Sequence, residues 1–217
     1  MKLAVLALFI AAVALSAAVY SRLPASVPIH WNAAGAVDDY APKAIGAFLL
    51  PAIMLALAGV FAALPAISPS GFDIEGRSRA YRAILLIILV FMLGIHVFAL
   101  LSAMNMARST SAVIPLLVGA LLVALGNYLP KVQRNFFIGI RTPWTLADED
   151  VWFRTHRLGG VLFVVSGVLL MAAGPFVHGR VQSGFIPGVV VLVALVLVIY
   201  SFAIYRRPDA GKGEVSP

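Results

Sequence analysis

Histidines and carboxylates are the side chains of this sequence with the most versatile chemistry, and they gather in two places. His30 lies shortly before Asp38 and Asp39, a set of ligand types that suits a metal ion. His156 lies seven residues after Glu149, so a helix would place the two on one face as an acid–base pair. The sequence has no HExxH, glycine-rich phosphate loop or Ser/His/Asp pattern, and its lack of Cys excludes a thiolate nucleophile or ligand. We therefore predict that the protein is not an enzyme and has no metal site and no cofactor.

A third histidine, His96, lies midway along an apolar stretch at residues 81–103. An ionisable residue inside a membrane span is by default a candidate for function. The simpler alternative is a neutral imidazole that is hydrogen-bonded to a helix carbonyl or a buried hydroxyl group. Both interpretations stay open on the sequence alone.

These residues belong to an unusually apolar chain. The sequence is 62% hydrophobic with a mean hydropathy of +1.00, far above a soluble domain. Several apolar runs reach the ~18–20 residues that cross a bilayer as a helix. We predict an all-α, polytopic integral membrane bundle of about six transmembrane helices, at residues 3–20, 44–67, 81–103, 112–129, 158–178 and 185–205.

The basic residues predict the orientation of this bundle. Twelve would lie on one side of the membrane: Lys2, Arg77, Arg79, Arg82, Lys131, Arg134, Arg141, Arg154, Arg157, Arg206, Arg207 and Lys212. Four would lie on the other: Arg22, Lys43, Arg108 and Arg180. The positive-inside rule therefore predicts that both termini are cytoplasmic. The net charge of +7 is explained by topology and by contacts with anionic lipids, so we expect no direct binding of nucleic acid.

A second interpretation of residues 3–20 is a cleavable signal peptide that is cut near Ser16–Ala18, although this apolar run is longer than the usual signal core. The C-terminal "RRPDAGKGEVSP" is polar and predicted to be disordered.

Two long polar segments remain. Residues 21–43 are predicted to be extracytoplasmic and contain aromatic and acidic side chains suited to an amphipathic peptide, because Trp and Tyr are favoured at binding hot spots. These candidates are His30, Trp31, Asn32, Asp38, Asp39 and Tyr40. The alternative is that Trp31 seats this loop at the membrane interface while the prolines stiffen it.

The second polar segment, residues 130–157, is predicted to be cytoplasmic. Its aromatic residues suit the headgroup region, and Lys131 and Arg134 suit lipid phosphates. "TPWTLADED" indicates a helix start that is capped by Thr145. We expect a short amphipathic helix on the membrane surface that carries Trp152 and His156, with Gly159-Gly160 allowing a turn or close packing before the fifth span.

The longest motif includes this segment: "GNYLPKVQRNFFIGIRTPWTLADEDVWFRTHRLGG", residues 126–160, which we call the signature loop. It resembles the signature of the SdpI family of bacterial membrane immunity proteins, with G-N-x-L-P-K, then N-x-F-x-G-I-R-T-P-W-T-L, then V-W-x-x-T-H-R-x-G-G. The upstream "LPASVPIHWNAAGAVDDYAPK" resembles a domain of unknown function that often precedes this family. With their spans, the two regions cover nearly the whole chain.

The resemblance implies a protein of the bacterial cytoplasmic membrane that protects against a secreted killing peptide, without catalysis. It also implies a second role, as a receiver that holds a small DNA-binding repressor at the membrane. The outer loop, with the six candidates above, would contact the toxin. The partner-binding candidates of the signature loop are Asn127, Pro130, Lys131, Asn135, Arg141, Thr142, Pro143, Trp144, Trp152, His156 and Arg157.

Two other functions stay open: a small transporter or permease-like bundle, and an envelope-homeostasis protein without a dedicated toxin. We expect four regions along the chain. Residues 1–67 hold spans one and two with the outer loop, and residues 68–111 hold the third span. Residues 112–180 are the SdpI-like region with the signature loop, and residues 181–217 hold the last span and the tail.

Overall fold

A computed structural model describes residues 2–32, 36–74, 78–106, 110–177 and 179–206. Six of its helices are long and apolar enough to cross a membrane, which confirms the predicted all-α membrane bundle. The long helices are α1 (Lys2–Val19), α2 (Lys43–Ala63), α3 (Arg79–Ala103), α4 (Thr110–Tyr128), α6 (Glu149–Ala173) and α7 (Gly179–Tyr205). The short elements are α5 (Pro143–Ala147), the strands β1 (Ser26–Trp31) and β2 (Val37–Pro42), and the 3₁₀ turns η1 (Tyr20–Arg22), η2 (Leu64–Ala66), η3 (Leu129–Lys131) and η4 (Gly174–Phe176).

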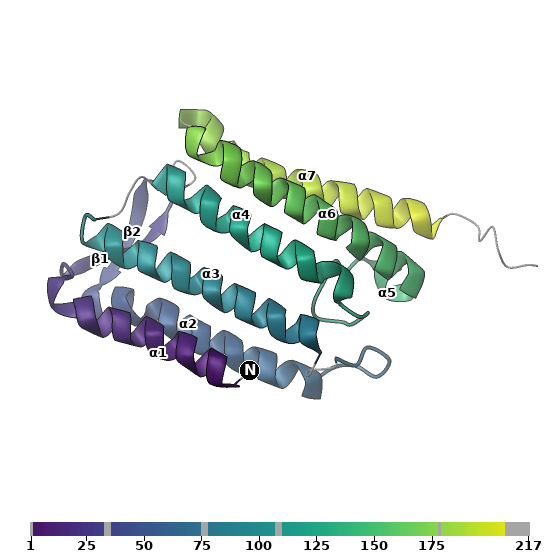
Figure 1. Cartoon of the computed structure of the whole chain (residues 1–217), viewed down its shortest axis with the longest axis horizontal. Helices are drawn as coiled ribbons and strands as arrows, with labels where there is room; N and C mark the ends of the chain where they lie inside the picture. The colour runs from purple at the N-terminus through teal and green to yellow at the C-terminus, as the bar shows by residue number, and fades with distance from the viewer. Residues whose placement is uncertain (1, 33–35, 75–77, 107–109, 178, 207–217) are drawn as a thin grey trace, which may run out of the picture.

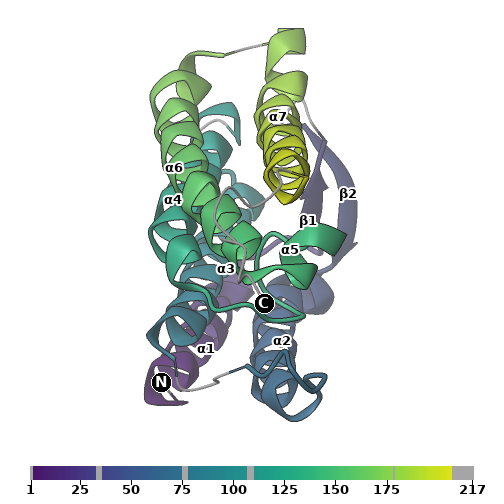
Figure 2. The same cartoon turned by 90° about the vertical axis from the view of Figure 1, so that its right-hand side faces the viewer.

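The long helices lie alongside one another, with α3 and α4 in the middle, α1 and α2 on one side and α6 and α7 on the other (Figures 1 and 2). The β1–β2 hairpin lies at one end of the bundle, which we call the hairpin end (Figure 1). The connection between α4 and α6 lies at the other, which we call the signature end (Figure 1). The two long polar segments of the sequence are therefore separated by the length of the bundle.

Helix length and capping follow from the sequence. The 25 residues of α3 rise by about 37 Å, enough to cross a hydrocarbon core of about 30 Å. Ser78 caps this helix by accepting a hydrogen bond from the backbone N–H of Tyr81 at 3.1 Å. Many large apolar side chains remain exposed on the sides of the bundle, among them Val191 and Leu192 of α7. An apolar exterior of this kind suits lipid rather than water.

Close packing of glycines holds α4 against α6. A Cβ on Gly119 would lie 2.6 Å from the carbonyl oxygen of Gly167, and a Cβ on Gly126 would lie 2.7 Å from that of Gly160. The glycines are seven residues apart on each helix, so both pairs lie on the same antiparallel contact face. The predicted close packing at Gly159-Gly160 is therefore confirmed, whereas the predicted turn there is not, because α6 continues through both residues.

The structure corrects the bounds of the predicted surface helix. Thr145 does not begin a helix that ends before the fifth span. Instead, Thr142 caps the five-residue α5, and Asp148 caps α6, accepting a hydrogen bond from Val151 N–H at 3.0 Å. The helix that starts at Glu149 then runs unbroken to Ala173, so the amphipathic segment is the first part of a long helix.

The hairpin is the second difference from the predicted all-helical chain. β1 and β2 pair antiparallel, with register shifts between Pro28 and His30 and between His30 and Trp31. Val27 is fully buried against α2. A Cβ added to Gly46 of α2 would lie only 2.6 Å from the Cβ of Val27. The hairpin thus packs on the helix ends through β1, and β2 lies on its outer side (Figure 2).

Some predictions lie outside the described residues. They concern the predicted disordered tail and the basic residues Arg77, Arg108, Arg207 and Lys212.

Candidate functional site

Asn135 organises the first half of the α4–α6 connection. Its side-chain oxygen accepts hydrogen bonds from the backbone N–H groups of Phe137 (2.8 Å) and Ile138 (2.7 Å). Its amide nitrogen donates to the carbonyl oxygens of Gln133 and Ile138, both at 2.9 Å. All four of its hydrogen-bonding positions are used, and the residue is buried. The side chain of Asn135 therefore satisfies backbone groups that regular secondary structure would otherwise pair, and it is not available to contact a partner.

A buried aromatic pair holds the second half of the connection against α6. The rings of Trp152 and His156 stack with centroids 3.9 Å apart, and both side chains are fully buried. The indole N–H of Trp152 donates to the carbonyl of Val132 at 2.8 Å. The backbone N–H of Ile140 donates to His156 Nε2 at 2.9 Å, while Nδ1 lies 2.8 Å from the carbonyl of Trp152.

These contacts define the role of His156. Because Nε2 accepts a hydrogen bond from the backbone N–H of Ile140, it carries no hydrogen, so Nδ1 must carry the hydrogen that is donated to the carbonyl of Trp152, and the imidazole is neutral. Both ring nitrogens thus bind backbone groups, whereas Glu149 is exposed at the start of α6. The acid–base pair considered from the sequence is not formed. His156 instead fixes the backbone at Gly139, whose φ of 123° would strain any other residue.

Short helix α5 connects the signature loop to the last span. The side chains of Thr142 and Thr145 form a reciprocal capping box, and Thr145 Oγ1 also donates to the carbonyl of Ile140 at 2.9 Å. The indole N–H of Trp144 donates to Ser201 Oγ in α7, and its ring lies 5.0 Å from that of Phe202. Trp144 therefore connects the signature loop to α7.

The remaining signature residues are more accessible. Arg141 is exposed and donates to the carbonyl of Phe136 at 2.8 Å. The Lys131 ammonium lies 4.9 Å from the centroid of the Tyr128 ring. Asn127 donates to the carbonyl of Val123 one helical turn earlier. Pro130, Pro143 and Arg157 are exposed.

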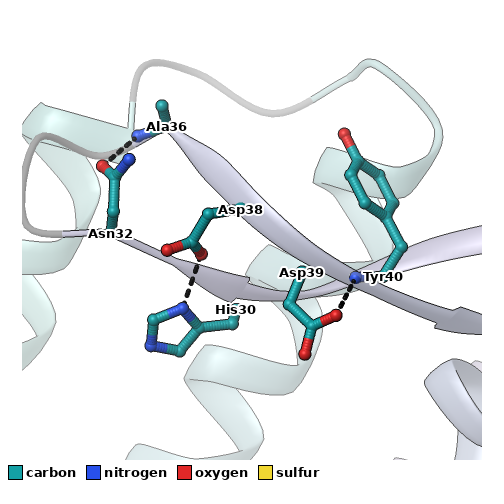
Figure 3. Close-up of polar contacts among 6 residues, drawn as sticks. All are labelled: His30, Asn32, Ala36, Asp38, Asp39 and Tyr40. Carbon is teal, nitrogen blue, oxygen red and sulfur yellow. Dashed lines mark hydrogen bonds and ion pairs between the residues drawn. The ribbon is translucent and has the colours of Figure 1, made fainter.

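The hairpin presents most of its predicted candidates to the outside. His30 Nδ1 lies 2.5 Å from Asp38 Oδ1 across the two strands, and both side chains are substantially exposed (Figure 3). Asp39 accepts a hydrogen bond from the backbone N–H of Tyr40 at 2.8 Å, and the Tyr40 ring points away from that carboxylate (Figure 3). Asn32 accepts from the N–H of Ala36 at 3.1 Å, which closes the start of the turn (Figure 3).

Trp31 differs from its neighbours. Its ring packs on Phe98 of α3 with centroids 5.4 Å apart, and the residue is half-buried. Among the described residues its buried indole nitrogen has no hydrogen-bond partner. Trp31 is therefore placed to anchor the hairpin on α3. The sequence suggested that this residue fixes the position of the loop, and the contact that the structure shows is with a helix.

His96 lies two turns from the hairpin end of α3 and connects three helices. Ser16 Oγ donates to the carbonyl of Ala47 in α2 at 2.6 Å, so it must accept from His96 Nε2, which lies 2.9 Å away. The same ring nitrogen lies 3.2 Å from the carbonyl of Ala12 in α1. These partners are the buried hydroxyl and helix carbonyl of the simpler interpretation. The imidazole thus joins α1, α2 and α3 beneath the hairpin.

Two partners were missed from the sequence. Ser16 and Ser201 lie in apolar spans and are fully buried. A serine inside an apolar run is a weak signal, because its hydroxyl group often bonds to its own helix. Among the described residues, no three His, Asp or Glu side chains gather as a metal site.

Comparisons with known proteins agree with this geometry. Residues 131–201 match the model of the SdpI/YfhL protein family, and residues 7–55 match a Domain of unknown function (DUF1648). The chain is 29% identical over 193 residues to the Immunity protein SdpI of Bacillus subtilis (strain 168), which covers 86% of each chain. No solved structure matches it.

The first matched region contains α5 and all of α6 with the Trp152–His156 pair, and the second contains the hairpin with Ser16 beneath it. The resemblance identified from the sequence is thereby confirmed, and the six apolar helices agree with it. Residues 131–201 of this chain are therefore similar to the SdpI/YfhL protein family, and the chain is a multi-pass protein of the cell membrane.

Proposed function

We propose that this protein is a membrane immunity protein that protects the cell against a secreted killing peptide. The observation that carries the proposal is the similarity to Immunity protein SdpI along 86% of both chains, which includes the hairpin and the signature loop. The proposal needs binding and no reaction. It agrees with a site in which His156 is occupied by backbone hydrogen bonds.

The hairpin is the proposed contact for the peptide. His30, Asp38, Asp39 and Tyr40 are exposed there, on a hairpin whose position is fixed by Val27 and Trp31. A rigid base lowers the conformational entropy that is lost when a partner binds. We assign the exposed side chains to recognition and Trp31 to positioning.

The signature end is the proposed contact for an intracellular partner, such as the small repressor implied by the family resemblance. Asn135, Thr142, Trp144, Trp152 and His156 are occupied by contacts within the protein. Among the exposed candidates at this end, we assign recognition to Arg141 and Arg157, because both carry exposed guanidinium groups. Two exposed guanidinium groups suit an acidic protein surface.

Survival under toxin challenge tests the immunity function. A Bacillus subtilis strain that lacks its own SdpI would express this chain, with membrane insertion verified by immunoblot, and would be exposed to culture supernatant of the parent strain. We expect the wild-type chain to restore survival. Equal killing with and without the chain, at matched membrane levels, would contradict the proposal for this peptide.

Two double variants test the two proposed contacts independently. His30→Ala combined with Asp38→Ala should lower survival, because it removes the exposed pair while leaving Val27 and Trp31 in place. Arg141→Ala combined with Arg157→Ala should leave survival intact but abolish membrane recruitment of the repressor, measured by fluorescence microscopy. Identical behaviour of the two double variants, at equal protein levels, would refute this division between the ends.

A further inference from the structure

A basic cleft lies at the signature end between the start of α3 and the end of α4. Its volume is about 710 Å³. Arg79 and Arg82 line it from α3, and Lys131 lines it from η3, directly after α4. No acidic side chain is found among the described residues that line this cleft. We propose that the cleft binds the phosphate headgroup of an anionic phospholipid.

The arrangement of α3 gives the cleft a charged mouth and an apolar interior. Arg79, Arg82, Ala83 and Leu86 follow one another at spacings of three, one and three residues, so they lie on one helical face. The two arginines occupy the first turn, and Ala83 and Leu86 continue the same face toward the middle of the span. A phospholipid has the same order of parts, with a charged headgroup followed by acyl chains.

The cations keep free donors for a phosphate group. Among the described residues, Arg82 donates through Nε to the carbonyl of Ser78, at 3.3 Å, and both terminal nitrogens of its guanidinium have no partner there. The Lys131 ammonium, held over the Tyr128 ring, has three donors, and no described carboxylate lines the cleft beside it. Tyr128 itself lines the cleft, and a tyrosine suits the headgroup level of a bilayer.

The position in the bundle favours a lipid over a soluble anion. The cleft lies at the end of two helices that are long and apolar enough to cross a membrane, and the ends of such helices are expected at the level of the headgroups. Basic pockets between transmembrane helices at such a position bind anionic headgroups, and each Lys or Arg near the surface contributes about 1 kcal/mol. The site is independent of the toxin contact, which lies at the hairpin end.

Native mass spectrometry of the purified full chain in detergent tests this site. The protein would be titrated with phosphatidylglycerol, with phosphatidylcholine and with inorganic phosphate. We expect tighter binding of phosphatidylglycerol than of phosphatidylcholine. For Arg82→Gln combined with Lys131→Gln, we expect an affinity for phosphatidylglycerol that is lower by about tenfold or more.

The matched control is Arg154→Gln combined with Arg206→Gln. It removes the same charge from exposed residues at the same end of the bundle, outside the cleft. Its affinity for phosphatidylglycerol should stay within about twofold of wild type, since neither arginine lines the cleft that would hold the headgroup. The thermal unfolding midpoint of each variant would verify that it is folded.

Three results would overturn the proposal. Equal loss of lipid in both double variants would mean that binding depends on net charge and not on the cleft. Displacement of the lipid by inorganic phosphate would identify a site for free anions. Unchanged lipid binding together with loss of repressor recruitment in Arg82→Gln, Lys131→Gln would identify a protein-docking surface.

Discussion

At the scale of single residues, the side chains of the signature loop mainly bond to its own backbone. Asn135, Thr145 and His156 each accept or donate hydrogen bonds that a helix or sheet would otherwise supply. A loop that is held in this way keeps one conformation at the membrane surface, where water competes for every unpaired backbone group. The concentration of polar residues in this segment therefore serves mainly to fold it.

Gly139 gives the sharpest test of this interpretation. In Gly139→Ala, the added Cβ would lie 2.3 Å from His156 Nε2 and would occupy a φ of 123°. We expect loss of the Ile140–His156 hydrogen bond and destabilisation of about 1–3 kcal/mol or more. The measurement is the thermal unfolding midpoint in detergent, together with the rate of limited proteolysis in the signature loop.

Gly71→Ala is the matched control for that substitution. Gly71 also has a positive φ, of 83°, but a Cβ there would meet nothing within 4 Å. It carries the backbone strain without the collision with the imidazole. If both variants were equally destabilised, the buried His156 contact would not be what requires glycine at residue 139.

At the scale of elements, glycines decide which pieces can approach one another. The pairs Gly119–Gly167 and Gly126–Gly160 allow α4 and α6 to pack backbone to backbone. Gly46 does the same for α2 and the hairpin, because Val27 occupies the space that a side chain would need. The hairpin is thereby fixed to the helices and not merely tethered by its two ends.

Gly46→Ala is predicted to displace the hairpin. Its Cβ would lie 2.6 Å from Val27 Cβ, so β1 must move, at a cost of about 1–3 kcal/mol. Faster proteolysis within the hairpin and weaker protection against the toxin should follow. Gly59→Ala, on the same helix with nothing within 4 Å, should be neutral or slightly stabilising. Unchanged proteolysis of Gly46→Ala would contradict the packing described for β1.

At the scale of the whole molecule, the bundle separates the two proposed recognition surfaces. The hairpin end presents His30, Asp38, Asp39 and Tyr40, and the signature end presents Arg141, Arg157 and the basic cleft. α3 reaches both ends, with Arg82 lining the cleft at one and Phe98 supporting Trp31 at the other. The distribution of basic residues predicts that the signature end is cytoplasmic.

Cysteine labelling tests that orientation. The natural chain has no Cys, so single substitutions provide unique labels. In intact cells, a membrane-impermeant maleimide should label Ser21→Cys at the hairpin end. It should label Glu149→Cys only after permeabilisation, because the signature end is predicted to be cytoplasmic. Both positions are exposed in the structure, so either can react once the reagent reaches it. The reverse pattern would mean that the chain is inserted with the opposite orientation.

The sequence by itself determined the membrane class, the six spans, the resemblance to the SdpI family and the two polar segments. These follow from the length of the apolar runs and from contiguous motifs, and both are local properties of the chain. It did not reveal the hairpin, because residues 26–42 contain prolines, acidic residues and no clear alternation. It also misplaced the start of α6, since an amphipathic first turn and an apolar continuation look like two elements when their neighbours are unknown.

Only the tertiary structure decided the roles of individual residues. Trp152, His156 and Asn135 looked like candidates for partner binding, and all three are buried against other parts of the chain. Ser16, Ser201 and Gly139 gave little signal, yet each holds two distant segments in contact. The cleft that is lined by Arg82 and Lys131 joins residues about 50 positions apart. The physical reason is common to all of them: hydrogen-bond partners, burial and charge convergence depend on distances in space, and residue types and spacings do not fix these until the helices pack.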